Sequence, residues 1–197
     1  MDVELAPLTV LVGRNGSGKS NFADALVFVR DLGMDASTSV SKRGGILGVR
    51  RWSRTKPFDV SITVRAAAQK SALESIFIEH SFTIASGRDG QWEFKRERIH
   101  GIGERHGTSK SATVKFLLAR NGNKITESRP SFPVGELPST TSAMLLGRQI
   151  WPPRTTEPLR AVRRYRLNPD EMRTPQKISG SLAVDVGRIG AANGCLS

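Results

Sequence analysis

The sequence predicts an α/β fold in which a mixed sheet is joined to an antiparallel β layer. A short apolar run at residues 8–12 leads directly into a glycine-rich loop. An amphipathic helix follows the loop, and the middle of the chain then alternates between apolar and polar residues. We therefore expect a strand, a loop, a helix and an antiparallel layer, in that order along the chain.

The run 8–12 (LTVLV) is rich in β-branched residues and apolar throughout, which is typical of a strand buried on both faces of a parallel sheet. After the loop, Phe22, Leu26 and Val29 recur at helical spacing, and Gly33 is placed to end a helix. We expect this helix to span residues 19–32 and to pack on the sheet that contains residues 8–12.

Residues 34–57 are polar, basic and glycine-rich without a sustained period, which predicts an irregular connection. Strands are then expected at 58–66, 75–85, 91–99, 113–119 and 124–127. Larger side chains occupy alternate positions from Ile78 to Ile84, and the sequences at 86–90 and 120–123 are typical of hairpin turns. The antiparallel layer should therefore cover about 58–127.

The last third of the chain is less regular. Residues 130–158 hold six of the ten prolines, so we expect a proline-rich connection with a short helix at 140–149. Residues 159–166 are basic and compatible with a helix. We interpret residues 1–185 as one N-terminal lobe and residues 186–197 as a frayed tail.

Composition limits the class of protein. The 197 residues include 30 Lys+Arg and 18 Asp+Glu, for a net charge of +12. A basic chain favours polyanionic partners, so DNA is a candidate partner; a solvated basic surface is the alternative. No run reaches the ~18 apolar residues that span a membrane, and Asp2 and Glu4 stand where a signal peptide is basic. We expect no membrane partner and a cytoplasmic protein. Cys195 is the single cysteine, which excludes a disulfide framework.

The glycine-rich loop matches G-x-x-x-x-G-K-[ST], the phosphate-binding Walker A pattern. Its residues are Gly13, Arg14, Asn15, Gly16, Ser17, Gly18, Lys19 and Ser20. Glycines allow the backbone amides of residues 15–20 to surround a β-phosphate at a helix N-terminus. Lys19 is the candidate catalytic residue because it can reach the β- and γ-oxygens, and the Ser20 hydroxyl is the candidate magnesium ligand. ATP and Mg²⁺ are the expected ligands; an unoccupied glycine-rich turn is the alternative.

The segment 12–33 resembles the first motif of the ATP-binding-cassette-like ATPases, which include structural maintenance of chromosomes (SMC) proteins, RecF and the overcoming-lysogenization-defect nucleases. The shared core is 15–21 with Asp24 and Ala25, which adds Asn21 to the nucleotide-binding set. Residues 42–45 (KRGG), the strand with Glu97, 165–169 (YRLNP) and 172–175 (MRTP) resemble bacterial predicted ATPases of the AAA family, often described as RecF-like. The resemblance covers about 5–185 and implies a P-loop NTPase N-terminal lobe.

The sequence also departs from this family. Members usually have one more strand before the first motif and a second lobe with a signature segment, a Walker B strand ending in Asp-Glu and a switch His. We find no counterpart of these between Met1 and Ser197. The chain is therefore interpreted as a truncated or frameshifted copy whose tail 186–197 lies outside the family pattern. A homodimer or the missing C-terminal lobe would complete the site.

Other candidates for catalysis are weaker. Glu79 follows an apolar run and imitates a Walker B acid, but alternation continues beyond it, which favours a solvated Glu in an antiparallel strand. Gln149 is placed to contact magnesium, with Gln69, Gln91 and Gln176 as rivals; a surface position is favoured for each. His80, His100 and His106 lack metal-ligand spacing and are predicted to be ordinary surface residues.

Two further patterns could bind nucleotides or nucleic acid. Residues 123–126 (NKIT) lack the carboxylate that reads guanine, so adenine is favoured. The basic segments 50–54 and 160–166 could contact phosphate, although a solvated loop or helix face is favoured.

Three functions remain open. The first is the ATP-binding part of an ATPase, with a DNA-maintenance or defence role implied only by the resemblance. The second is a nucleotide-binding remnant without turnover, and the third, less favoured, is a P-loop kinase for a small molecule. We expect little or no ATP hydrolysis because the sequence offers no Walker B acid pair.

Overall fold

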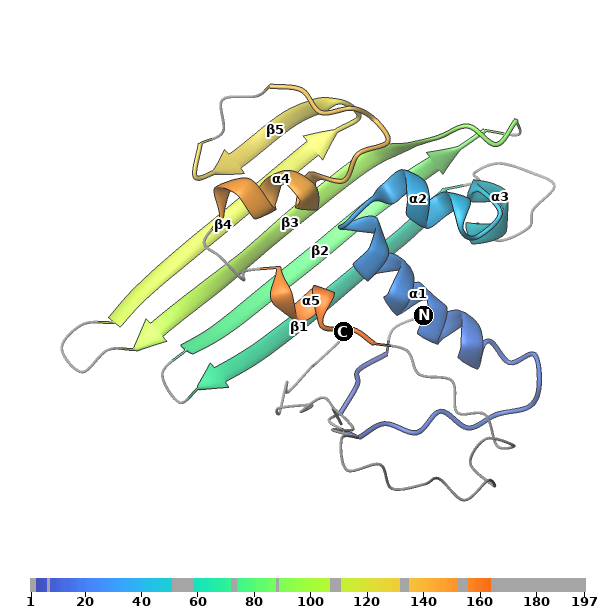
Figure 1. Cartoon of the computed structure of the whole chain (residues 1–197), viewed down its shortest axis with the longest axis horizontal. Helices are drawn as coiled ribbons and strands as arrows, with labels where there is room; N and C mark the ends of the chain where they lie inside the picture. Colours follow the sequence, from blue (N-terminus) through green and yellow to red (C-terminus); the bar gives the residue numbers. More distant parts are fainter. Residues whose placement is uncertain are drawn as a thin grey trace, which may run out of the picture.

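The computed structural model describes residues 3–6, 8–50, 59–71, 74–87, 89–106, 111–131, 135–151 and 156–163. It consists of one twisted antiparallel sheet with the helices gathered on one of its faces (Figure 1). We call the opposite side of the sheet, which no described helix covers, the open face.

The sheet has five strands in sequential order. They are β1 (Val60–Ser71), β2 (Glu74–Ser86), β3 (Trp92–His106), β4 (Ser111–Asn121) and β5 (Lys124–Arg129). Every neighbouring pair is antiparallel, which confirms the expected antiparallel layer. Alternation places Ile78, His80, Phe82 and Ile84 of β2 on the helix side, while Glu79, Ser81 and Thr83 face the open side.

A β-bulge interrupts this alternation in β3. Thr83 pairs with Arg96 and Ile84 pairs with Phe94, so Lys95 is the extra residue. The bulge reverses the facing of the residues that follow it. Phe94 and Glu97 are therefore both buried on the helix side, although they are an odd number of positions apart.

The strand expected at residues 8–12 is not formed, and this prediction is wrong. Leu8, Val10 and Val12 are 85%, 74% and 89% exposed, and the segment is irregular. The described sheet is fully antiparallel rather than mixed. A strand that is apolar on both faces needs neighbouring strands and cover on both sides. No described strand pairs with residues 8–12 to provide this.

The helix that follows the loop is formed as expected. It is α1 (Lys19–Leu32), and it buries Phe28, Val29 and Leu32 on the sheet. The Phe28 ring meets the Phe82 ring edge-on at a centroid distance of 6.4 Å. All three buried residues lie in the second half of α1, so the first half, next to the loop, is less covered.

Residues 34–57 were expected to be irregular, but their described part contains α2 (Ala36–Ser41) and α3 (Ile46–Val49). Asp35 begins α2 by accepting a hydrogen bond from the Thr38 amide at 2.9 Å. Gly44 and Gly45, with φ of 77° and 82°, turn the chain between the two helices. These helices are too short for a periodic signal, which explains the error.

The remaining helices complete the covered face. The expected helix at 140–149 is α4 (Ala143–Ile150), which packs on β3 and β4. The helix α5 (Glu157–Arg160) packs on α1, β1 and β2. Residues 161–163 are not helical, so the basic helix suggested at 159–166 ends at Arg160; its last part lies outside the described residues. Arg30 Nη1 donates to the Val162 carbonyl at 2.9 Å and ties this end of the chain to α1.

Candidate functional site

The glycine-rich loop spans residues 13–18 and leads directly into α1. Gly16 and Gly18 have φ of 80° and 91°, a region that side chains strongly disfavour. At Gly13 an added Cβ would lie 2.8 Å from Ser17 Oγ. Gly16 and Gly18 therefore meet a backbone demand of this loop, whereas a side chain at Gly13 would only require Ser17 to move.

The N-terminus of α1 is suited to an anion. Gly18 is its N-cap, no side chain caps the first amides, and the first turn has no acidic residue. Uncapped amides and the helix dipole together give this end a partial positive charge. A phosphate group would supply the missing hydrogen-bond acceptor.

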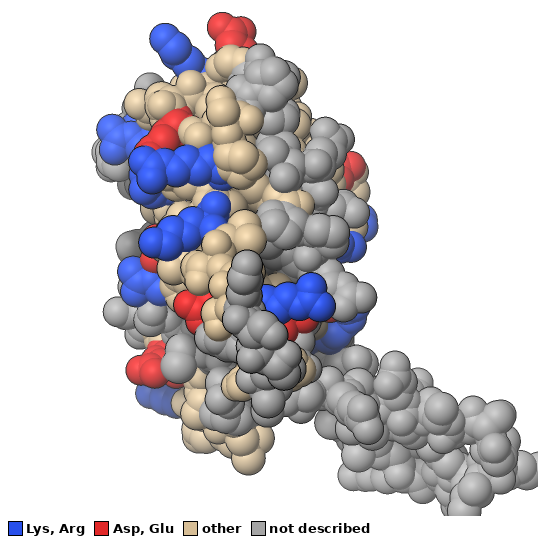
Figure 2. Space-filling view, turned by 90° about the vertical axis from the view of Figure 1, so that its left-hand side faces the viewer, with Lys and Arg blue, Asp and Glu red and all other residues tan. Residues whose placement is uncertain are grey.

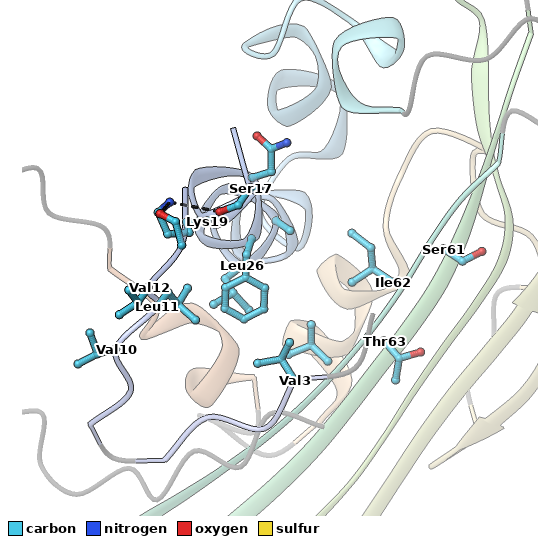
Figure 3. A pocket seen from close by; sticks show the side chains of 16 residues that line it. Val3, Val10, Leu11, Val12, Ser17, Lys19, Leu26, Ser61, Ile62 and Thr63 are labelled. Atoms are coloured by element: carbon cyan, nitrogen blue, oxygen red, sulfur yellow. Dashed lines mark hydrogen bonds between the residues drawn. The ribbon is translucent and has the colours of Figure 1, made fainter. Parts of the chain in front are cut away.

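Lys19 lies in the first turn with its ammonium folded back over the loop. Its Nζ donates to the carbonyl oxygens of Gly13 and Arg14 at 2.6 and 2.8 Å, and to Ser17 Oγ at 3.2 Å (Figure 3). These bonds hold the loop closed on itself. To reach a bound phosphate, the ammonium must exchange them for phosphate oxygens.

The other motif residues lie at the surface around this turn. Arg14, Asn15, Ser20 and Asn21 are exposed, so they are accessible to a ligand. The Ser20 hydroxyl, which the motif predicts as a magnesium ligand, is among these exposed groups. The described residues contain no group of three or more His, Cys, Asp or Glu that could hold a metal ion. A magnesium ion here would therefore need oxygens from the nucleotide and water in addition to Ser20.

An ion pair links α1 to the segment 42–45. Arg43 Nε donates to Asp24 Oδ2 at 2.9 Å, and its guanidinium lies 5.0 Å from the centre of the Phe28 ring. Arg43 Nη1 also donates to the Ser39 carbonyl at 3.0 Å. The pair fixes α2 and the following turn along the helix that carries the loop. Sequence reasoning identified both residues as part of motifs but not as partners.

An apolar cavity of about 840 Å³ lies behind the loop. Figure 3 shows Val3 of the N-terminal segment, Leu26 of α1 and Ile62 of β1 around the same space. Phe22 and Ala25 extend the apolar lining, while Ser17 and Lys19 mark the end next to the loop. The cavity suits apolar side chains rather than phosphates, so the candidate position for an anion is the N-terminal end of α1 alone.

The weaker candidates fall elsewhere. Glu79 forms an ion pair with Arg65 across β1 and β2 on the open face, as expected for a strand residue. Gln69 and Gln91 are exposed, and residues 123–126 belong to the hairpin between β4 and β5. His100 is half-buried, with its ring 5.8 Å from the Phe77 ring. The described structure does not include Gln176, residues 51–54 and 164–166, or the side chains of Gln149 and His106.

His80 was expected at the surface, and this prediction is wrong. It is fully buried, and its Nε2 lies 2.9 Å from Glu97 Oε1. Glu97 also accepts from Arg120 Nε at 2.9 Å, from Ser142 Oγ at 2.6 Å and from the Ala143 amide at 2.9 Å. This polar cluster attaches the beginning of α4 to the middle of the sheet.

The charge of Glu97 is maintained despite its burial. Burial alone would raise the pKa of the carboxyl, but the hydrogen bond from His80, the Arg120 guanidinium and the Ala143 amide lower it further than burial raises it. The result is a pKa below the usual range. Arg120 also donates to the carbonyls of Pro138 and Thr141 at 3.1 and 2.7 Å, so the cluster holds the whole approach to α4.

Comparison with known families identifies the class as an AAA domain of the P-loop NTPase type. The chain belongs to the family described as "AAA domain, putative AbiEii toxin, Type IV TA system", whose model matches residues 8–106, half of the chain. No curated protein and no solved structure matches the chain. Nucleotide binding is the general property that an AAA-type domain indicates. Among the described helices, none has both the length and the apolar character needed to cross a membrane.

Proposed function

We propose that the chain binds Mg·ATP or Mg·ADP through residues 13–21, as the nucleotide-binding portion of an AAA-type ATPase. The observation that carries this proposal is the uncapped N-terminus of α1, preceded by a loop whose Gly16 and Gly18 adopt positive φ. Lys19, directly after this loop in the first turn of α1, adds the positive charge that a nucleoside triphosphate requires.

Each loop residue has a definite role in this proposal. The amides of residues 15–20 bind the β-phosphate, and Lys19 neutralises the β- and γ-oxygens. Arg14, Asn15 and Asn21 border the bound phosphates, and Ser20 holds magnesium. Magnesium, when bound, supplies positive charge to the phosphate oxygens.

Turnover is expected to be slow. Hydrolysis by this class needs carboxylates that hold the metal and orient water. Glu79, the nearest sequence candidate, is paired with Arg65 on the open face. A single missing charge-stabilising group costs roughly 10³ to 10⁵ in rate in related enzymes, so the chain should hydrolyse ATP near background. More specifically, we propose that this ATPase has a RecF- or SMC-like role in DNA maintenance or defence. The alternative is a remnant that binds nucleotide and does not hydrolyse it.

The test is a titration of a fluorescent ATP analogue with magnesium. Lys19→Ala should weaken binding by tenfold or more, about 1.4 kcal/mol, because it removes the charge that faces the phosphates. Lys42→Ala is the matched control, since Lys42 is an exposed lysine at the end of α2, and it should bind like the parent. Equal affinity of the Lys19→Ala variant and the parent would show that the loop has been assigned wrongly.

Phosphate release is measured in the same preparations. Turnover of about one per second that disappears in Lys19→Ala would contradict the expectation of slow hydrolysis. In that case Glu79 is the first carboxylate to substitute.

A further inference from the structure

The open face of the sheet is polar and basic over much of its area. The strand register places six basic side chains on it: Arg65, Arg96, Arg98, Lys115, Lys124 and Arg129. The register also places four acidic side chains there, Glu79, Glu93, Glu104 and Glu127. In Figure 2, Lys and Arg side chains follow the left margin of the molecule, on the side of the sheet away from the helices. The face therefore carries a net positive charge.

A groove of about 360 Å³ lies on this face where small residues leave the sheet surface low. Ser61, Thr63, Ser81 and Thr83 of β1 and β2 form its floor, and Arg96 and Arg98 of β3 rise beside it. Hydroxyl and guanidinium groups are the donors that phosphate oxygens accept from most readily. Ser61 Oγ and Thr83 Oγ1 are hydrogen-bonded to each other at 2.9 Å, so the groove offers the hydroxyls of Thr63 and Ser81 and the two guanidinium groups as donors.

The arginines of the groove differ in their surroundings. Arg98 Nη1 lies 3.7 Å from Glu127 Oε2, and Arg129 shares the same carboxylate at 3.6 Å. Arg96 is exposed and makes no ion pair with a described residue. The charge of Arg96 is thus available to a ligand, while that of Arg98 is partly balanced.

We propose that the open face binds nucleic acid through its phosphate backbone, with Arg96 and Arg98 as the central contacts. The argument is charge complementarity: a basic chain of net charge +12 presents a donor-lined groove on an uncovered face. The side chains that line the groove from the open face include no aromatic ring, so base stacking is not provided there. Binding is therefore independent of sequence and falls steeply with salt. The site is separate from the nucleotide loop, which adjoins the helix layer.

The test measures fluorescence anisotropy of labelled single-stranded DNA, duplex DNA and RNA of one sequence, between about 50 and 200 mM salt. Arg96→Gln with Arg98→Gln should weaken binding by about tenfold or more and reduce the salt slope by about 2, one for each phosphate contact. Glu127→Gln should strengthen binding because it releases Arg98 and Arg129. The matched control is Lys42→Gln, compared with Arg96→Gln alone, because it removes the same single charge from an exposed residue of the helix layer; it should change affinity by less than about twofold.

Three results overturn the proposal: a parent chain that binds no oligonucleotide at low salt, a groove variant that binds like the parent, and a control variant that loses as much affinity as the groove variant. Circular dichroism checks that each variant is folded. If the groove double variant does not fold, the single variants decide: Arg96→Gln should weaken oligonucleotide binding and Glu127→Gln should strengthen it. Lys19→Ala should leave oligonucleotide binding unchanged, which separates this proposal from the nucleotide site. The preferred oligonucleotide identifies whether the natural backbone is DNA or RNA.

Discussion

Glu97 connects four parts of the fold through one carboxylate. It accepts hydrogen bonds from His80 on β2, Arg120 on β4, and Ser142 and Ala143 at the beginning of α4. A buried charge with several satisfied partners stabilises only while every partner is present. The position of α4 therefore depends on this residue.

Glu97→Gln should lower the free energy of unfolding by about 3–5 kcal/mol, because it leaves the buried guanidinium of Arg120 without its counter-charge. Urea denaturation followed by circular dichroism measures the change. Glu93→Gln, on the exposed side of the same strand, is the control and should change stability by less than about 0.5 kcal/mol. A similar loss in both variants would show that the effect belongs to the strand and not to the cluster.

The lowered pKa of Glu97 also predicts an acid limit. The usual pKa of 4.5 describes the unfolded chain, and the folded value lies below it. The contribution of Glu97 to stability is therefore present above about pH 4.5 and is lost as the pH falls through the folded pKa. The denaturation midpoint of the parent should approach that of Glu97→Gln as the pH is lowered from 7 to about 3. Parallel pH profiles for the two proteins would contradict this.

The alternation that predicts β2 contains a signal for one member of this cluster and none for another. His80 occupies the same inward series as Ile78 and Phe82, so its burial follows from the pattern that predicted β2. The burial of Glu97 is harder to predict from the sequence. Phe94 and Ile99 are five positions apart, so both can be buried only if a bulge lies between them. A bulge is an additional residue, and a periodic pattern alone does not show which residue it is.

The helix after the glycine-rich loop was predicted more successfully, for a different reason. Gly16, Gly18 and Lys19 follow a fixed spacing whose geometry is local, so the turn and α1 could be expected from the motif. The hydrogen bonds of Lys19 to the loop carbonyls and the pairing of Arg43 with Asp24 depend on tertiary placement. No spacing rule contains that information.

At the scale of elements, β3 is fitted closely against β4 at one glycine. A Cβ added to Gly101 would collide with the Phe116 ring and with the Phe77 carbonyl oxygen. At Gly103, two positions further along the same strand, an added Cβ would meet nothing within 4 Å. Close packing therefore requires glycine at position 101 but not at position 103.

Gly101→Ala should destabilise the chain by about 1–3 kcal/mol through overpacking. Gly103→Ala should be neutral or stabilise it by up to about 1 kcal/mol, because alanine restricts the unfolded chain. Thermal unfolding of the two variants compares them directly. A destabilised Gly103→Ala with an unaffected Gly101→Ala would show that the packing of β3 has been described wrongly.

The five strands of the sheet were predicted well, whereas the strand expected at residues 8–12 is not formed. Both results follow from how far the signal for a strand is local in sequence. Hairpin strands such as β4 and β5 are defined by alternation and by a turn, which are local in sequence. Residues 8–12 have the composition of a buried strand, but composition does not provide the neighbours that a strand requires.

At the scale of the whole molecule, the exposed run 8–12 is an apolar segment on a basic chain. Leu8, Val10 and Val12 are exposed, and the net charge of +12 repels other copies at low salt. Salt screens this repulsion, so the parent should self-associate as the salt concentration rises. Val10→Lys should reduce the association measured by light scattering, whereas Leu47→Lys, at an exposed leucine of α3, should not. Equal suppression by both variants would assign the effect to charge alone.

The sequential order of the sheet has a consequence for how the chain is made. Each strand pairs with the strand synthesised just before it, so every hairpin can close soon after it leaves the ribosome. The helix α1 is synthesised before any strand that it covers, and its packing must wait for them. The Arg30 contact with Val162 bridges 132 positions, so it can form only when nearly all of the described fold has been synthesised. The helix that follows the glycine-rich loop is thus among the first elements to be synthesised and the last to be fully held in place.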